Sequence, residues 1–388
     1  MASSSDEPHE HGGPLRVLFL ASEWSSSKGE LSIVNRELAI NMAKFPEVHV
    51  TFFVPQCNDK DKEAACEHKI DLVEATRIPG MDELMWLCFP PRDKPIDVVV
   101  GHGLKLGPQA KIIRNSHNCK WVQVVDTDQD ELSVFKEYPN AISSGEKKHE
   151  TEVELCELAD FVVTIGPKLY EAFYSYLCSC KNKEKVFNFT PGIFSEIPEV
   201  AQDLERSGKF RVLLFGSGDA EDFSLQGFDI ASKAVAELGD IRLLFVGAPA
   251  GKEKEVKERF HECGIRDSNL TVRTFSPSRE CLKNTFCEVD VAVIPSRTEG
   301  FGLTGLAALS AGLPILVSRN SGFGEALSKV PFGSYSVIDS NDAQVWAKAI
   351  KDVRDKDRKQ RLEEAEKLRT SYKEEYRWNN KVRNSLER

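Results

Sequence analysis

Residues 295–325 read PSRTEGFGLTGLAALSAGLPILVSRNSGFGE, and they indicate the fold more specifically than any other part of the sequence. The apolar run 289–294 before them is typical of a buried strand, and a helix is expected from about residue 303. Gly300 and Gly302 lie between the two, where the absence of a side chain lets the backbone approach a ligand closely. The first turn of the helix offers unpaired N–H groups and the positive end of the helix dipole, which favour phosphate. The segment therefore predicts a ligand-binding loop between a strand and a helix.

Strand-like and helix-like patterns alternate along the rest of the chain. Leu31, Val34, Leu38 and Met42, for example, form one apolar face of a helix. Strands that alternate with helices predict parallel sheets covered on both faces, and the pattern restarts after a polar stretch near 192–209. We therefore expect two doubly wound α/β halves that share a ligand cleft. The predicted strands are 16–21, 48–54, 97–101, 121–125 and 161–164 in the first half, and 210–215, 241–246, 270–273, 289–294 and 314–317 in the second.

The composition argues against several classes of protein. The chain has 388 residues, and its 51 Lys and Arg against 61 Asp and Glu leave a net charge of −10, so no nucleic-acid partner is expected. No apolar run reaches about 18 residues, so no transmembrane helix is expected. Residues 1–14 are polar, indicate a flexible tail and lack the apolar core of a secretory signal. The ten cysteines have no metal or redox spacing, which favours reduced thiols in a cytoplasmic protein.

Two other glycine loops imitate nucleotide-binding motifs. Gly216-Ser217-Gly218 follows a predicted strand, but the third glycine of a dinucleotide fingerprint would fall on Glu221, so a dehydrogenase is disfavoured. Residues 247–252 imitate a P-loop with one residue too few, and Glu253 replaces the Ser or Thr that would hold magnesium. A turn after a strand is the better interpretation of that segment.

Two polar residues at strand ends are candidates for chemistry in the cleft. Glu299 lies at the rim of the loop between strand 289–294 and the helix from about residue 303, where its carboxylate can accept hydrogen bonds from sugar hydroxyls. A surface glutamate in a tight turn is the alternative. His102 lies between two glycines, which favours a close ligand contact, with a hydrogen-bonded structural histidine as the alternative.

Residues 295–325 resemble the donor-site signature of retaining glycosyltransferases of the GT-B fold, of the family 4 or glycosyl transferase group 1 type. Individually weaker matches in the same order extend the resemblance over nearly the whole chain. They are Gly29 in the family's glycine-rich N-terminal loop, His102 as its end-of-strand histidine, Thr190-Pro191-Gly192 as the exit to the interdomain linker, and Trp378 in the last helix.

The resemblance implies an α/β protein with two Rossmann-like domains that face a central cleft. A nucleotide sugar, with a UDP-sugar favoured, would be held mainly by the C-terminal domain and would give its sugar to an unidentified acceptor with retained anomeric configuration. Such a mechanism needs neither a covalent nucleophile nor a metal, only a good leaving group whose charge is stabilised. The implied parts are 15–195 for the acceptor domain, 196–371 for the nucleotide-sugar domain and 372–388 for a helix that crosses back to the first domain.

The resemblance also assigns roles to individual residues. Glu299 would contact the donor sugar, and His102 would lie beside the donor sugar and the acceptor. Gly29 would approach the phosphate from the first domain. Asp126 and Asp128 are candidates for binding acceptor hydroxyls, and turn or helix-capping roles are equally open. The donor-binding loop comprises Gly300, Phe301, Gly302, Leu303 and Thr304, with the last three turning N–H groups toward the diphosphate.

Three positions depart from the family pattern. Ala307 stands where the family has a second glutamate, eight residues after the first, that binds the ribose. Ser217 follows Gly216 where the family has an arginine, and Gln226 stands where it has a lysine that also holds the diphosphate. Each lost charge-assisted contact is expected to cost about 1.5–3 kcal/mol. Arg297 is either a substitute cation or a surface arginine at the rim of the cleft.

Two functions are therefore open. Glu299, His102 and the donor loop favour an active retaining glycosyltransferase. Ser217, Gln226 and Ala307 together motivate the alternative, a catalytically weakened GT-B protein that binds or senses a sugar or nucleotide, or that acts as an interaction module. Sugar-nucleotide epimerisation and phosphorolysis rank last, because the sequence places no basic cluster for a free phosphate beside the loop.

Overall fold

The computed structural model describes residues 13–25, 30–179, 183–195, 197, 199, 202, 208–274 and 279–378. Gly29 and most of the predicted tail, residues 1–12, lie outside the described residues. Among the helices of the described segments, none is long and apolar enough to span a membrane.

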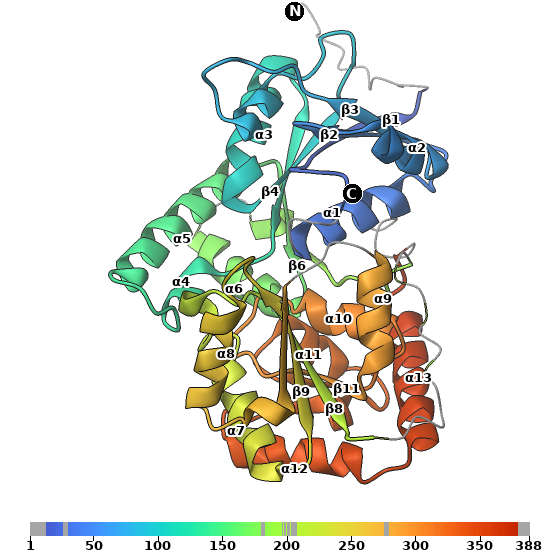
Figure 1. The fold of residues 1–388 in the computed structure, drawn as a ribbon. Coiled ribbons are helices and arrows are strands. Elements are labelled where there is room, and N and C mark those ends of the chain that lie inside the picture. The colour runs from blue at the N-terminus through green and yellow to red at the C-terminus, as the bar shows by residue number, and fades with distance from the viewer. Residues whose placement is uncertain are drawn as a thin grey trace, which may run out of the picture.

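The first half of the chain forms a parallel sheet, because each apolar strand is followed by a segment that returns across a face of the sheet. Within the described residues the strand order is β3-β2-β1-β4-β5-β6-β7, and Figure 1 shows this sheet in the upper half of the molecule. The strands are β1 (Leu15–Leu20), β2 (Val48–Val54), β3 (Asp71–Glu74), β4 (Val98–His102), β5 (Lys120–Val125), β6 (Phe161–Ile165) and β7 (Val186–Phe189). The helices are α1 (Glu30–Met42), α2 (Asp59–Glu67), α3 (Gly103–His117), α4 (Gln129–Ser133), α5 (Ala141–Leu158) and α6 (Pro167–Tyr176), with short 3-10 helices η1 (Glu83–Cys88), η2 (Leu177–Ser179) and η3 (Lys183–Lys185).

The second half repeats this design around its own parallel sheet. The order there, again for the described part of the chain, is β10-β9-β8-β11-β12-β13. The strands are β8 (Arg211–Phe215), β9 (Arg242–Ala248), β10 (Leu270–Thr274), β11 (Val291–Ile294), β12 (Ile315–Ser318) and β13 (Val337–Ile338). The helices are α7 (Phe228–Leu238), α8 (Glu253–Glu262), α9 (Arg279–Glu288), α10 (Leu303–Ser310), α11 (Gly322–Leu327), α12 (Ala343–Arg354) and α13 (Arg358–Glu375), with η4 (Ala220–Asp222), η5 (Asp267–Asn269) and η6 (Gly333–Ser336).

The predicted fold class, two doubly wound parallel sheets, is confirmed. All ten strands expected from the sequence are present. Three further strands, β3, β7 and β13, are not indicated by the sequence, and all three lie at sheet edges. They have four, four and two residues. Strands this short are too brief for an apolar run or an alternation to identify them.

Both sheets change direction at the same topological point. The chain proceeds outward from β1 to β3 and then returns to place β4 beside β1; it likewise returns to place β11 beside β8. In such sheets ligands bind outside the carboxyl ends of the strands, next to this point. His102, which ends β4, and the segment that follows β11 therefore occupy the expected ligand positions.

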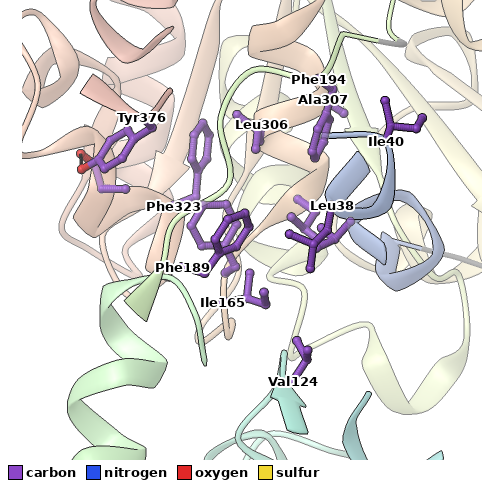
Figure 2. Packing of buried hydrophobic residues seen from close by; sticks show 14 of the residues in the cluster. Leu38, Ile40, Val124, Ile165, Phe189, Phe194, Leu306, Ala307, Phe323 and Tyr376 are labelled. Carbon is purple, nitrogen blue, oxygen red and sulfur yellow. Dashed lines mark hydrogen bonds between the residues drawn. The ribbon is translucent and has the colours of Figure 1, made fainter. Parts of the chain in front are cut away.

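The largest apolar core joins the two halves. It contains Val124, Ile165 and Phe189 from the first sheet together with Leu306 and Phe323 from helices of the second half. Figure 2 shows these side chains gathered at the boundary. Burial of apolar surface at about 25 cal/mol per Å² makes such a shared core a strong constraint on how the halves are held together.

The end of α13 returns to the first half of the chain. The hydroxyl of Tyr372 donates to Pro191 O at 2.9 Å, and the indole N–H of Trp378 donates to Ile193 O at the same distance. The Trp378 ring also packs against Phe189, with ring centroids 5.4 Å apart. Trp378 therefore contacts the last strand of the first sheet.

The contact between the halves predicts the effect of a single methyl group. Gly166 precedes α6 with a φ of +89°, and a Cβ there would overlap the ring of Phe301 from the second half. Gly166→Ala is expected to cost about 1–2 kcal/mol for the backbone conformation and about 1–3 kcal/mol more for the overlap, as measured by urea denaturation. Gly251→Ala is the matched control, because Gly251 has a φ of +80° but no atom within 4 Å of its Cβ position. Equal losses of unfolding free energy in the two variants would show that the Phe301 ring moves aside without a cost in free energy.

Candidate functional site

The donor-side loop is shaped by backbone hydrogen bonds to the segment before α11. The Glu299 N–H donates to Asn320 O at 3.1 Å, and Gly322 N–H donates to Gly300 O at 3.2 Å. The Phe323 N–H donates to the carbonyl oxygen of Phe301 at 2.6 Å. Residues 299–301 and 320–323 thus run alongside each other. The two ends of the quoted segment support the same loop.

Glu299 lies at the start of α10. Its Oε2 is 3.1 Å from where a Cβ of Gly302 would be, and Gly302 opens the helix with a φ of +103°. This glycine conformation lets the carboxylate approach the first turn, since any side chain at that position would crowd it. Glu299 is half-buried as a residue, and the Oε2 atom of its carboxylate is buried. Contact of Glu299 with a donor sugar stays a prediction.

The apolar side chains of the donor loop are used for packing. Phe301, Leu303 and Ala307 are 2%, 6% and 7% exposed and belong to the shared core, where Figure 2 labels Ala307. Phe301 and Leu303 can therefore offer a ligand only their backbone groups. Ala307, at the position of the family's ribose-binding glutamate, presents a methyl group and no polar atom.

The structure brings Gly216, Ser217 and Gln226 together at the end of β8. A Cβ placed on Gly216 would lie 3.1 Å from Gln226 Oε1. The hydroxyl of Ser217 donates to Asp219 Oδ2 at 2.7 Å, and the Asp219 N–H donates back to Ser217 Oγ at 3.3 Å. A carboxylate therefore stands beside the position where the family has a diphosphate-binding arginine.

Arg297 is paired within its own domain. Its Nη1 and Nη2 donate to the two carboxylate oxygens of Asp229 at 2.7 and 2.8 Å, and Nη1 also donates to Ser224 O. These hydrogen bonds to Asp229 raise the pKa of the guanidinium, and the side chain is 18% exposed. Arg297 is thus a partly exposed arginine whose guanidinium is paired with Asp229. Its proposed part in donor binding stays a prediction and would require it to leave Asp229.

His102 is fully buried at the end of β4. Its Nε2 lies 2.7 Å from Oδ1 of Asn35 on α1. Burial lowers the pKa of the imidazole to about 3, so His102 is neutral at physiological pH. A neutral imidazole can take part in hydrogen bonds with sugar hydroxyls, but it offers no charge to a phosphate.

Asp126 lies beside the residues that follow the two predicted catalytic residues, His102 and Glu299. A Cβ on Gly300 would overlap the carbonyl oxygen of Asp126, and a Cβ on Gly103 would lie 3.3 Å from Asp126 Oδ1. Asp126 therefore lies between the residue after His102 and the residue after Glu299. Its place at the meeting point of the two halves keeps it a candidate for binding an acceptor.

Asp128 is the N-cap of α4, one of the two roles left open by the sequence. Its Oδ1 accepts hydrogen bonds from the N–H groups of Asp130 and Glu131 at 3.1 and 3.4 Å. Its Oδ2 accepts a third from the hydroxyl of Tyr176 at 2.8 Å, and the residue is only 4% exposed. The carboxylate of Asp128 is thus engaged by the protein, and binding of an acceptor is not supported by this geometry.

Lys168 is a residue that the sequence reasoning missed. From α6 it donates to Thr298 Oγ1 at 2.6 Å and to Asn320 O at 3.3 Å, and it pairs with Glu131 at 2.9 Å. It therefore ties the first half of the chain to the residue before Glu299. Its only sequence signal is its place shortly after a strand end.

Glu152 on α5 is a second residue that was missed. It is 1% exposed, and neither carboxyl oxygen has a hydrogen-bond partner among the described residues. Burial raises its pKa to about 9, and the carboxylates of Asp126 and Asp128 add to this shift. Its Oε1 lies 3.6 Å from the Cβ position of Gly103. A neutral carboxylic acid therefore stands next to the residue that follows His102.

Within the described part of the chain, no three His, Cys, Asp or Glu side chains are grouped so that they could hold a metal ion. Gly29 lies outside the described residues, so its predicted approach to the phosphate is not placed.

A family model described as "Family 4 Glycosyltransferase in conflict systems" matches residues 18–384. A D-inositol 3-phosphate glycosyltransferase from Corynebacterium urealyticum is 26% identical over 316 residues, which cover 75% of this chain and 70% of that protein. A protein of the same name from Mycolicibacterium smegmatis is 32% identical over 139 residues, which cover 34% of this chain and 31% of that protein.

Solved structures show the same fold. Sucrose-phosphate synthase from Thermosynechococcus elongatus superposes with a TM-score of 0.72 at 16% identity, covering 96% of this chain and 98% of that one. Anabaena Alr3699/HepE in complex with UDP and glucose superposes with a TM-score of 0.67 at 14% identity, covering 96% and 99%. At these identities the likeness concerns the fold alone, which is the GT-B fold that the resemblance implies.

The neutral state of Glu152 predicts how stability depends on pH. The unfolded chain releases this proton near pH 4.5 and the folded chain near pH 9, so the free energy of unfolding falls as pH rises between these values. The slope from this group is at most about 1.4 kcal/mol per pH unit. Glu152→Gln is expected to remove this fall in the free energy of unfolding. Urea denaturation at pH 5, 6.5 and 8 should therefore show the variant gaining stability relative to the unmodified protein as pH rises. Glu154→Gln, on the exposed side of the same helix, is the control. Parallel pH dependences in all three proteins would contradict the assignment.

Proposed function

Because the chain belongs to the family 4 glycosyltransferases of conflict systems and is therefore a glycosyltransferase, we propose that it transfers a sugar from a UDP-sugar to an acceptor hydroxyl with retention of the anomeric configuration. The observation that carries the proposal is the contact of the donor loop with the end of β5. There Gly300, next to Glu299, packs on Asp126. Glu299 and the first turn of α10 are thereby placed opposite the carboxyl edge of the first sheet.

The donor-side groups suit a nucleotide sugar. The carboxylate of Glu299 can accept hydrogen bonds from hydroxyls of the transferred sugar. The N–H groups of Leu303 and Thr304 open α10, and the positive end of that helix favours the diphosphate. The complex of Alr3699/HepE with UDP and glucose supports UDP as the first nucleotide to test.

Transfer exchanges one bond at the anomeric carbon for another. The bond from that carbon to the diphosphate oxygen breaks, and a bond to the acceptor oxygen forms on the same face of the sugar. The proton of the acceptor hydroxyl passes to the departing diphosphate. Negative charge grows on the diphosphate in the transition state, so its stabilisation by the N–H groups of α10 would contribute most to the rate.

One observation favours a second candidate function, a weakened enzyme that binds a sugar or nucleotide without efficient turnover. Ser217 and Gln226 supply no cation, and Asp219 adds a negative charge through its hydrogen bond to Ser217. The two missing cationic contacts, at about 1.5–3 kcal/mol each, lower both the affinity for the diphosphate and the stabilisation of the leaving group. Turnover by the unmodified protein decides between the two functions.

Glu299→Gln tests the donor-site assignment. The loss of a charged hydrogen-bond acceptor is expected to lower kcat/KM by about 10- to 150-fold, which corresponds to about 1.5–3 kcal/mol. The measurement is UDP release from UDP-glucose, UDP-galactose and UDP-N-acetylglucosamine, with free sugars, inositol and inositol phosphate as acceptors. An inositol phosphate is included because the names of the curated relatives point to it. Glu258→Gln, exposed on α8 of the same domain, is the control. Unchanged turnover in Glu299→Gln would end this assignment.

Restoring the missing cations tests the position of the diphosphate. The double variant Ser217→Arg, Gln226→Lys is expected to lower the Kd for UDP by about tenfold or more, because each cation adds a charge-assisted contact. Titration calorimetry at two salt concentrations measures the affinity and shows whether the gain is electrostatic. The variant Ser334→Arg, Gln344→Lys carries the same added charge on exposed positions of the second domain. An equal gain in both variants would mean that the diphosphate does not lie at the end of β8.

A further inference from the structure

Asn35 is a buried polar residue on the apolar side of α1. It is 2% exposed and lies three residues before the buried Leu38, so the two residues share a helix face. Both ends of its amide are engaged. Its Nδ2 donates to Leu20 O at the end of β1 at 2.9 Å, and its Oδ1 lies 2.7 Å from Nε2 of His102.

The carbonyl of Leu20 sets the orientation of the Asn35 amide. A carbonyl oxygen only accepts, so the amide nitrogen must face Leu20 and the amide oxygen must face His102. An amide oxygen also only accepts, so His102 must carry its proton on Nε2. In the neutral ring Nδ1 is then without a proton and can only accept a hydrogen bond.

Nδ1 of His102 has no partner within the described residues. The atom is buried and forms no hydrogen bond there. A buried acceptor without a partner costs free energy, so this arrangement favours a ligand that supplies one. The group that satisfies Nδ1 must be a donor. A hydroxyl meets this requirement, and a phosphate oxygen does not.

We propose that Asn35 is a positioning residue that holds His102 in the Nε2–H tautomer and so leaves Nδ1 as a hydrogen-bond acceptor for a hydroxyl of the bound sugar. The inference rests on the proposed function, because it names what His102 recognises in the cleft. His102 then selects for a hydroxyl at one position of the sugar and contributes nothing to binding of the diphosphate.

The tautomer is measured directly in the unmodified protein. Two-bond ¹⁵N–¹H correlation spectra distinguish a protonated ring nitrogen from a bare one, and loss of a signal in His102→Gln assigns it. We expect Nε2 protonated and Nδ1 bare, and the same spectrum without change down to about pH 5. A proton on Nδ1 would overturn the proposal. This measurement needs no activity, so it stands apart from a failure of the proposed transferase function.

Two substitutions of Asn35 test the consequence for turnover. Asn35→Leu removes the acceptor for Nε2–H, so the tautomer is no longer fixed and kcat/KM is expected to fall about tenfold or more. Asn35→Asp keeps an acceptor but adds a negative charge that favours the imidazolium, whose Nδ1 carries a proton. The activity of Asn35→Asp is expected to approach that of the unmodified protein at high pH. It is expected to fall at low pH, with an ionisation in the pH profile that the unmodified protein lacks.

The control for these variants is Asn41→Leu. Asn41 is equally buried on the same helix, but it donates to Glu37 O and does not contact His102. It is expected to lower stability without altering the tautomer or the shape of the pH profile. The other titratable residues on the elements around His102 are the same in every variant, and they are Glu23, Arg36, Glu37, Lys105, Asp126 and Glu152. A pH profile of Asn35→Asp that matches the unmodified protein would overturn the proposal, since a purely structural asparagine predicts that result.

Discussion

Gly300 packs against the backbone of Asp126 so closely that no side chain fits between them. The position of the donor loop relative to the first sheet depends on this contact. Gly166 extends this contact, because a Cβ there would overlap Phe301. Gly322 instead fixes the loop within its own half, because a Cβ there would lie 2.5 Å from Gly300 O. Lys168 adds directed hydrogen bonds across the same boundary. Backbone packing therefore sets the distance between the halves, and the shared apolar core holds them at that distance.

The electrostatics of the site differ between its two ends. At the end of β8 the expected cations are absent, Ser217 is bonded to Asp219, and Arg297 is neutralised by Asp229. The first turn of α10 would still offer a diphosphate the positive end of a helix, which supplies only about half an elementary charge. Under the proposed function, the missing cations at 217 and 226 would weaken stabilisation of the leaving group more than binding of the sugar.

Much of the fold, and part of the site, was predictable from local patterns. Apolar strand runs and helical spacing depend on neighbouring residues, so they identified ten strands and the loop that holds Glu299. The pairs that define the site are not local. Lys168 and Thr298 are 130 positions apart, and Asn35 and His102 are 67 apart. No periodicity encodes such contacts. Asp128 was ambiguous because a strand-end aspartate serves equally as a cap or a ligand, and only its bonds to the α4 N–H groups decide.

Two buried titratable groups beside the first sheet, His102 and Glu152, are kept neutral for the same reason. Burial lowers the pKa of His102 to about 3 and raises that of Glu152 to about 9, so at pH 7 neither carries a charge. Neutral groups with unfilled hydrogen-bonding capacity match a substrate whose recognisable features are hydroxyls. Charged groups of the first half also lie at this boundary, because Asp126 packs against Gly300 and Lys168 donates to Thr298. The neutral groups around His102 therefore suit hydroxyl recognition from the first half, and Glu299 would add a charged acceptor from the second.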